Sequence, residues 1–239
     1  MAHPQRHRFR LLITAGPTRE PIDAVRYISN RSSGRLGLAL AAAAAEAGHE
    51  VTLLLGPGPR SDDLPEAVKV HRFESAADLE ALLGEHLPAC DVLVMAAAVA
   101  DYRPVAVHEG KLPSDKGQGQ TLTLEPVPDL VRQCAARRGS GQRIVAFALE
   151  ASEQLEARAR TKMQHKQVDA IVANPLATMD GQTIDALWLD TRGGRAASGP
   201  LSKQAFAPWL LARLSELLQA EQPVPTPSAD GPDARGGSG

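Results

Sequence analysis

The chain has 239 residues, enough for one sizeable α/β domain or two small ones. Its 26 basic and 28 acidic residues give a formal net charge of -2, which provides no basic footprint for nucleic acid. Two cysteines are too few for a disulfide framework and indicate a reducing, cytoplasmic compartment, while the lack of a signal peptide and of a long apolar run argues against a membrane segment.

The first half of the chain predicts strands and helices in alternation after a polar lead-in at residues 1–8. An apolar run at 9–15 ends at a Gly-Pro pair and predicts a buried strand. A polar loop is expected to follow to Ser33. Residues 34–48 are rich in strong helix formers and stop at a glycine, which predicts a helix, and the next strand is expected at 50–55. This order, at the length of one crossover unit, implies parallel strands.

The rest of the chain continues the alternation. Strands are predicted at 68–73, 91–97, 143–149 and 169–173, with an edge strand at 183–190. Helices are predicted at 76–87, 129–138, 152–166 and 202–218, with Ser152 as the N-cap of the third. Residues 104–120 predict a long mobile loop, a candidate lid. The composition of residues 221–239 predicts a disordered tail, so one folded domain is expected at 9–220.

The fold class that follows is α/β, a Rossmann-like, doubly wound, mostly parallel sheet in three layers. Sheets of this class bind ligands at the carboxyl ends of their strands. The loops after Ala15, Ala97, Leu149 and Ala173 are therefore the expected ligand edge.

The loop at residues 16–37 reads GPTREPIDAVRYISNRSSGRLG and leads directly into a predicted helix. The free amides and dipole at a helix start favour an anion. The residues at the start of this helix that suit an anion are Asn30, Ser32, Ser33 and Gly34. They form a candidate phosphate cradle, to which Arg19, Arg26 and Arg31 add positive charge. An N-cap flanked by solvated arginines is an equally open interpretation.

Several single residues elsewhere in the chain are candidates for ligand binding, and each also has a purely structural interpretation. Asp101 follows a buried strand and suits a ribose hydroxyl, a base amino group or Mg²⁺ held through water, or else caps a turn. Lys111 and Lys116 lie in the candidate lid, where solvation is the ordinary fate of a lysine. Phe147 either belongs to the core or stacks on a base. Further lysines and one asparagine, each with a solvated or turn alternative, are Lys162 and Lys166 on one helical face and Asn174 after a strand.

Several catalytic motifs are missing from the sequence. GxGxxG does not follow the first strand, and GxxxxGK[ST], GxSxG and HExxH do not occur. The seven histidines show no metal-binding spacing. These absences disfavour an NAD enzyme, a P-loop kinase and zinc or serine hydrolysis. Basic residues, amides, Asn and Asp remain, which suits phosphoryl or nucleotidyl transfer by positioning and charge neutralisation.

The runs GPTREPIDAVRYISNRSSGRLG and AAAVADYRP together resemble the signatures of phosphopantothenoylcysteine synthetase, over roughly residues 8–219. The resemblance implies a stand-alone ligase of coenzyme A biosynthesis, although in many bacteria this domain follows a flavin-dependent decarboxylase. Such a ligase activates 4'-phosphopantothenate with CTP, carrying Mg²⁺ on the triphosphate, and then joins the acyl-cytidylate to L-cysteine as a cytoplasmic homodimer. The alternatives are a nucleotide-binding protein and an NAD(P)-type oxidoreductase on the same fold.

The resemblance also implies roles for single residues. Asn30 matches the contact to the activated acyl group, and Asn30 and Lys111 are the implied catalytic residues. The implied nucleotide-binding residues are Met95, Ala96, Ala97, Asp101, Lys111, Pro128, Asp129, Leu130, Val131, Phe147, Lys162 and Lys166. No residue is expected to bind the metal directly. The chain departs from the family's KxKK loop, where it retains only Lys111 before Leu112, Pro113 and Ser114, and from an acidic-Asn stretch that reads TIDA at 183–186.

Overall fold

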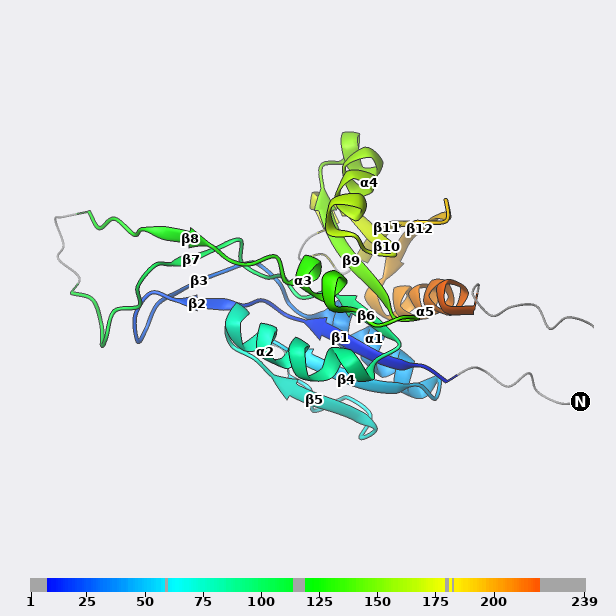
Figure 1. The fold of residues 1–239 in the computed structure, drawn as a ribbon, viewed down its shortest axis with the longest axis horizontal. Helices are drawn as coiled ribbons and strands as arrows, with labels where there is room; N and C mark the ends of the chain where they lie inside the picture. Colours follow the sequence, from blue (N-terminus) through cyan, green and yellow to red (C-terminus); the bar gives the residue numbers. More distant parts are fainter. Residues whose placement is uncertain (1–7, 59, 114–118, 179–180, 182, 220–239) are drawn as a thin grey trace, which may run out of the picture.

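A computed structural model describes residues 8–58, 60–113, 119–178, 181 and 183–219. Its centre is an eight-stranded sheet in the order β12-β11-β10-β9-β6-β1-β4-β5 (Figure 1). These strands are β1 (Arg10–Ala15), β4 (Glu50–Leu55), β5 (Val68–Arg72), β6 (Val92–Met95), β9 (Arg143–Glu150), β10 (Ala170–Pro175), β11 (Thr183–Asp190) and β12 (Arg195–Ser202). The strands from β5 to β10 run parallel, and β11 and β12 are antiparallel additions. The predicted Rossmann-like, mostly parallel sheet is confirmed.

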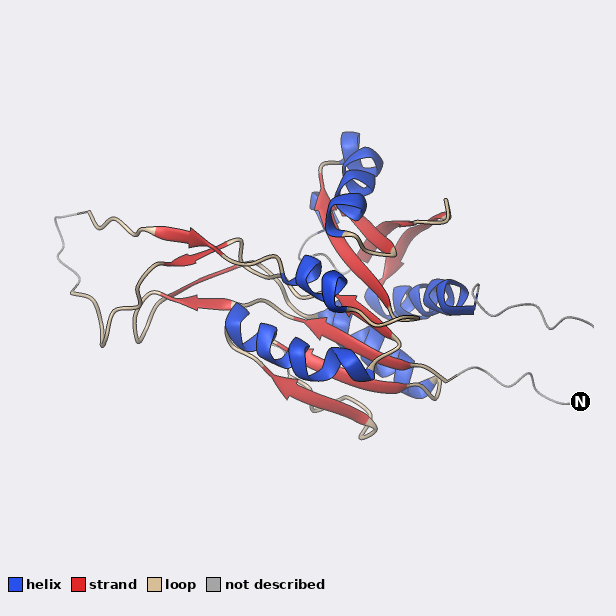
Figure 2. Cartoon of the chain, in the orientation of Figure 1, coloured by secondary structure: helices blue, strands red, loops and turns tan. Residues whose placement is uncertain are grey.

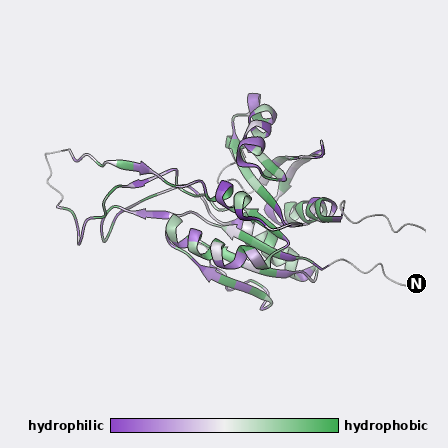
Figure 3. Ribbon diagram, in the orientation of Figure 1, coloured by the Kyte–Doolittle hydropathy of each residue, from purple (hydrophilic) through white to green (hydrophobic). Residues whose placement is uncertain are grey.

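Helices cover both faces of this sheet and make three layers. Helices α1 (Arg35–Glu46) and α5 (Lys203–Gln219) share one hydrophobic core, and α2 (Ala76–His86), α3 (Leu130–Arg137) and α4 (Leu155–Lys166) share the other. Short 3₁₀ turns are η1 (Leu87–Ala89), η2 (Ser152–Gln154) and η3 (Leu176–Thr178). Side chains of β1 alternate between the cores, as the period of a strand requires: Leu11 and Ile13 face α1, whereas Leu12 faces α2. Both sides of the strand are therefore apolar, and the strands of the central sheet are largely green, the hydrophobic colour, in Figure 3.

Two long connections, expected as loops, instead form hairpins. The first contains β2 (Arg19–Pro21) and β3 (Tyr27–Ser29), and the second contains β7 (Tyr102–Pro104) and β8 (Leu124–Pro126). Both project to the same side of the sheet and lie next to each other (Figure 2). We call the described residues 19–29, 102–113 and 119–126 the arm. Strands of three residues are too short for a hydrophobic pattern to reveal, which is why the first polar loop was predicted without them.

Two further predictions about elements are wrong. The strand at 183–190 was expected at the edge, but β12 pairs with β11 and forms the edge itself. The sequence of β12, RAASGPLS, contains Gly and Pro and few residues of high β-propensity, so it gives no strand signal. Ser152 does not cap α4, because the turn η2 precedes the helix and Gln154 occupies the N-cap position.

Several predictions fall on residues outside the described part of the chain. These are the lead-in at 1–7, the tip of the candidate lid at 114–118 with Lys116, and the tail at 221–239. The limits of the folded domain therefore stay a prediction. Every helix in the described ranges is too short or too polar to cross a lipid bilayer.

Candidate functional site

Between β1 and β6 the order in which the chain adds strands to the sheet reverses from one side to the other. The loops that follow these two strands are hydrogen-bonded to each other. The Ala97 amide donates to Thr14 Oγ1 (3.1 Å), and the Ala98 amide donates to the Gly16 carbonyl (2.9 Å). The Ala100 amide donates to Thr18 Oγ1 (3.0 Å). This is where an open α/β sheet places its ligand crevice, at the carboxyl ends of its strands.

A pocket of about 260 Å³ opens at this point. It lies where the start of α1 meets the carboxyl ends of β6, β9 and β10 and the start of α5. The residues that line it are Arg31, Ser32, Ser33, Gly34, Arg35, Leu36, Gly37, Ala96, Ala97, Ala98, Phe147, Ala148, Leu149, Asn174, Ile184 and Lys203. Eight residues singled out from the sequence are thereby brought together, namely Arg31, Ser32, Ser33, Gly34, Ala96, Ala97, Phe147 and Asn174.

The start of α1 differs from the starts of α2 and α3. Ser75 and Asp78 form a reciprocal capping box on α2, and the Asp129 side chain accepts from the Arg132 amide on α3 (3.2 Å). On α1 the N-cap is Gly34, with φ 65°, and no side chain within the described residues caps the helix. A left-handed N-cap suits glycine, because other residues are strained there. The first turn of α1 therefore presents amides to the pocket, as the phosphate-cradle hypothesis requires.

Asn30 and Asp101 are not among the residues that line the pocket, although Arg31 and Ala98, which lie near them in the sequence, are. The Asn30 side chain donates from Nδ2 to the Val99 carbonyl (2.8 Å), which ties the first loop to the second. Asp101 is exposed, and its carbonyl accepts from the Val127 amide (2.9 Å), so it lies next to the connection that leads through Pro128 into α3. Their roles toward a ligand stay predictions.

Three of the predicted nucleotide-binding residues belong to one hydrophobic core or pack against it. Met95 is buried, and its sulfur accepts from Thr14 Oγ1 (3.7 Å). Leu130 is buried in the core under α3, and Val131 packs partly buried against the same core. Such residues contribute to a site through their backbone or by holding its walls in place.

The two lysines predicted on one face of α4 are paired with carboxylates. Lys162 forms an ion pair with the buried Glu150 at the end of β9, and Arg158 approaches the same carboxylate (3.6 Å). Lys166 Nζ contacts both oxygens of Asp129 (2.8 and 2.9 Å). Partial burial opposes the ionisation of Asp129, but hydrogen bonds from Lys166 and the Arg132 amide outweigh it, so the pKa of this carboxyl lies below its usual range.

The other predicted cations are distributed differently from the expectation. Lys111 is exposed on the arm, away from the pocket lining. Of the three loop arginines, only Arg31 lines the pocket. Arg26 is held by Asp23, and Arg19 pairs with Glu74 (3.3 Å) while it lies over the Tyr27 ring (4.4 Å).

Sequence reasoning missed several residues of this pocket. Lys203, at the start of α5, and Ile184, on β11, come from the last part of the chain. They reach the site only because β11 and β12 fold back beside β10, and no local pattern signals that return. Arg35 was within reach of sequence reasoning, since it is a cation in the first turn of the predicted helix.

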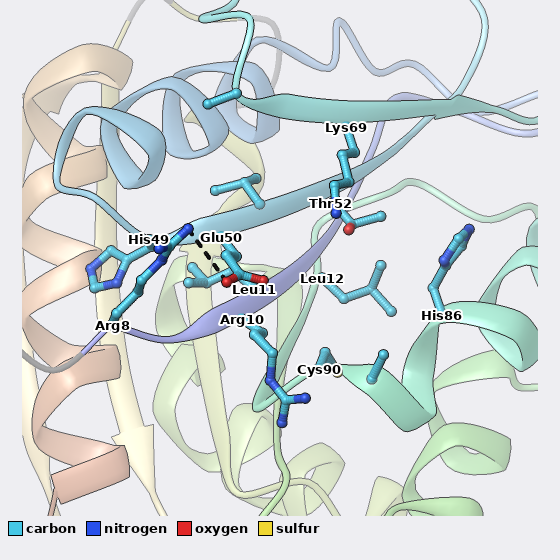
Figure 4. A pocket seen from close by; sticks show the side chains of 13 residues that line it. Arg8, Arg10, Leu11, Leu12, His49, Glu50, Thr52, Lys69, His86 and Cys90 are labelled. Carbon is cyan, nitrogen blue, oxygen red and sulfur yellow. Dashed lines mark ion pairs between the residues drawn. The ribbon is translucent and has the colours of Figure 1, made fainter.

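A second pocket, of about 540 Å³, lies on the opposite side of the sheet from the first, where the strands begin (Figure 4). It is lined by Arg8, Arg10, Lys69 and His86 among others, but two of these cations are neutralised within the chain. Arg8 pairs with Glu50 (3.3 Å), and the Arg10 guanidinium binds Asp91 through Nε (3.1 Å). This pocket faces the amino ends of the strands, which is not where sheets of this class hold ligands.

Among the described residues, no group of three or more His, Cys, Asp or Glu is placed to hold an ion. Both cysteines are buried, and burial raises the pKa of the Cys90 thiol to about 12 and that of Cys134 to about 11. Neither thiol is therefore suited to act as a nucleophile or a metal ligand at neutral pH.

Residues 7–218 match the family model described as the DNA/pantothenate metabolism flavoprotein C-terminal domain. The chain is 40% identical over 206 residues to the coenzyme A biosynthesis bifunctional protein CoaBC of Vibrio cholerae, covering 83% of this chain and 50% of that protein. It is 41% identical over 170 residues to a cysteine/cysteine sulfinic acid decarboxylase of an unknown prokaryote, covering 70% of this chain and 46% of that protein. The chain thus spans about half the length of these curated relatives.

Solved structures share the architecture. The crystal structure of the C-terminal domain of CoaBC has a TM-score of 0.76 and 32% identity, and the match covers 89% of this chain and 97% of that one. A Cab2 mutant in complex with phosphopantothenate-cysteine has a TM-score of 0.69 over 88% of this chain and 87% of that one. Its identity of 18% shows likeness of fold alone.

Proposed function

Because the chain belongs to the DNA/pantothenate metabolism flavoprotein C-terminal domain family, we propose that it is a phosphopantothenate–cysteine ligase of coenzyme A biosynthesis. The observation that carries the proposal is the pocket at the switch point of the sheet, where the uncapped start of α1 meets the segment 96–98 and Phe147. CoaBC is named for coenzyme A biosynthesis, and Cab2 binds phosphopantothenate-cysteine. The decarboxylase name of the other relative belongs to a protein of which the match covers only 46%.

The proposed reaction has two steps. The carboxylate of 4'-phosphopantothenate attacks the α-phosphate of CTP, which releases pyrophosphate and leaves an acyl-cytidylate. The amine of L-cysteine then attacks the acyl carbon, the new amide forms, and CMP leaves. CTP as the nucleotide follows from the sequence resemblance, and ATP is the alternative.

The chain's own groups suit the binding of phosphates and a base. The amides at the start of α1, with Ser32 and Ser33, are suited to a phosphate, and Arg31, Arg35 and Lys203 add positive charge around them. Phe147 is partly exposed in the pocket and offers a ring face for a base. Lys162 and Lys166 are held by Glu150 and Asp129, so a phosphate would have to compete with these carboxylates for them.

Mg²⁺ in this proposal is bound by the triphosphate and by water. The described residues contain no cluster of ligand side chains for an ion. Magnesium would neutralise charge on the phosphate oxygens. The protein's part is to hold the nucleotide and the acyl group in line.

The proposal is tested by pyrophosphate release from purified protein, Mg²⁺, 4'-phosphopantothenate and cysteine, with CTP and ATP in separate reactions. We expect release with CTP that requires phosphopantothenate. Release with ATP alone would change the nucleotide assignment. If neither nucleotide gave release but CTP bound, the chain would be a nucleotide-binding protein rather than a ligase.

Asn30 is proposed to donate a hydrogen bond to the acyl oxygen during the attack of cysteine. We expect Asn30→Asp to slow the second step by about 10²–10³-fold, the effect of removing one oxyanion donor, so that pyrophosphate is released but acyl-cytidylate accumulates. Quench-flow with separation of nucleotide products measures both steps.

Two controls separate this role from simple disordering of the loop. Asn30→Ala also loses the bond to the Val99 carbonyl and should accumulate the same intermediate. Ser29→Ala removes a neighbouring bond, from Ser29 Oγ to the Thr18 carbonyl (2.7 Å), and should leave the two steps in their normal ratio. Equal slowing of both steps in Asn30→Asp would contradict the acyl role.

We also propose that the ligase is a homodimer in the cytoplasm. Most exposed large apolar side chains among the described residues are on the arm: Val25, Tyr27, Tyr102, Val105, Val107, Leu122 and Leu124. A concentration of apolar surface on one projecting part of a protein is typical of an interaction site. A second copy of the chain is the proposed occupant.

A further inference from the structure

Asp23 is a buried carboxylate at an unexpected place, the tip of the first hairpin of the arm. Its side chain is fully shielded from solvent, although the residues around it, Ala24 and Val25, are exposed. A charged group is excluded from water only where other groups replace its hydration. The contacts of Asp23 therefore show which segment of the arm this side chain holds in place.

The two oxygens of Asp23 have different tasks. Oδ1 accepts from the amides of Val25 (2.8 Å) and Arg26 (2.7 Å), which closes the turn of the hairpin itself. Oδ2 accepts from Arg26 Nε (2.9 Å) and from the Leu112 amide (3.0 Å), which belongs to the other half of the arm. The first oxygen thus serves the local turn and the second reaches a distant segment.

Arg26 completes this contact from the other side. Its Nη2 donates to the Leu112 carbonyl (3.0 Å) while the guanidinium pairs with Asp23. Both backbone polar groups of Leu112 are therefore bound by one ion pair. The guanidinium and the three amides together hold the pKa of Asp23 well below its usual range, so the carboxylate stays charged through the neutral range.

Neighbouring bonds extend the contact over the whole segment before Leu112. The Ala24 amide donates to the Gly110 carbonyl (3.0 Å), and the His108 amide donates to the Ile22 carbonyl (3.0 Å). Lys111 lies between Gly110 and Leu112, so the residues on both sides of it are anchored to the hairpin. Its own side chain is exposed and unconstrained by these bonds.

We propose that Asp23 is a positioning residue which, through Arg26 and the backbone of Leu112, fixes the segment that carries Lys111, a residue implied to act in catalysis. This inference rests on the proposed function for the part that concerns Lys111. The anchoring of Leu112 by Asp23 stands independently of it.

Asp23→Asn separates the local turn from the distant anchor. The amide oxygen of Asn still serves the turn, but its NH₂ group faces the Leu112 amide and the Arg26 guanidinium, which are donors as well. We expect hydrogen exchange at the Leu112 amide to become at least about tenfold faster, as loss of a charge-assisted bond predicts. Unchanged exchange at Leu112 would overturn the anchor, whether or not the chain is a ligase.

A matched control removes a similar aspartate–arginine contact at the amino ends of the strands. Asp91 binds the Arg10 guanidinium through Oδ1 (3.1 Å) and the Arg10 amide through Oδ2 (2.7 Å). Asp91→Asn removes an equivalent contact without touching the arm. It should leave exchange at Leu112 and the kinetics of pyrophosphate release as in the unmodified chain.

A double-mutant cycle tests whether Asp23 acts through Lys111. Asp23→Asn should lower kcat/KM for CTP by about tenfold or more, and Lys111→Met should lower it as well. If Asp23 only positions Lys111, the double variant will be no slower than Lys111→Met, because contacts in one network are non-additive. Additive losses would overturn the positioning role. If the unmodified chain releases no pyrophosphate, the proposed function fails, and exchange at Leu112 still decides the anchor.

Discussion

Gly37 sets how closely the first turn of α1 approaches the sheet, and therefore where the amides at the pocket lie. A Cβ atom at this position would stand 2.3 Å from Ala15 Cβ and 3.3 Å from Ala15 Cα. Such a contact between two backbone-fixed atoms cannot be relieved by a rotamer change. The absence of a side chain at Gly37 is thus a condition for the site, although glycine lowers helix propensity.

We expect Gly37→Ala to lower the free energy of unfolding by about 1–3 kcal/mol, because overpacking forces α1 away from β1. Urea denaturation measures this change. The control is Gly84→Ala in α2, where a Cβ meets no described atom within 4 Å. There the substitution should be neutral or stabilise the protein by about 0.5–1 kcal/mol. Equal effects of the two substitutions would contradict the close approach at Gly37.

At the scale of single elements, α3 shows how one residue serves structure and a predicted site at once. Asp129 caps the helix through the Arg132 amide and also binds Lys166 on α4. The sequence resemblance assigns Asp129 to a nucleotide-lining turn, but these contacts alone account for an acidic residue at this position. Substitutions that keep the cap and remove the charge can separate the two roles.

Asp129→Ala should lower the free energy of unfolding by about 1 kcal/mol, the usual value of an N-cap, and Asp129→Asn should restore most of it. The lowered pKa of Asp129 means that its ionised form is favoured by folding, so its contribution is present above the ordinary aspartate range and lost as pH falls through the folded pKa. Urea unfolding between neutral and acid pH checks this. A nucleotide role predicts a raised KM for CTP even in Asp129→Asn, whereas a capping role alone leaves it unchanged.

Elements with a strong local pattern were predictable, and those defined by their partners were not. β4 and β11 have the predicted bounds, because each is a run with clear apolar positions between turn residues. β12, β2 and β3 exist only through pairing with a neighbouring strand. The site follows the same division: the residues of the first and second loops were found from their motifs, whereas Lys203 and Ile184 were missed because they arrive by the return of β11 and β12.

At the scale of the whole molecule, the arm lies outside the central sheet. It carries apolar side chains into solvent, and its two halves are joined by hydrogen bonds rather than by a core of their own. Burial of this surface against a second copy would remove apolar area from water, which is the main driving force of such associations.

We expect sedimentation of the full chain to give a dimer and Val107→Glu combined with Leu124→Glu to shift it toward monomer. Both side chains are exposed on the arm, so the change should leave the fold intact, as circular dichroism can verify. Leu176→Glu, an exposed apolar position outside the arm, is the control and should remain dimeric. A monomeric unmodified chain, or an equal effect of Leu176→Glu, would contradict the proposed interface.

The start of α1 has a consequence for how the protein meets its ligand. Within the described residues α2 and α3 have a side-chain cap on their first turns, whereas α1, like α4, has none, and of these two only α1 starts at the pocket. A bound phosphate would then be the missing cap, and the helix would be finished by the metabolite it holds. Folding and substrate concentration are thereby coupled: at about 100 times the dissociation constant, a ligand specific for the folded state adds about 2.7 kcal/mol. The concentration of substrate in the cell would therefore affect the fraction of this protein that is folded.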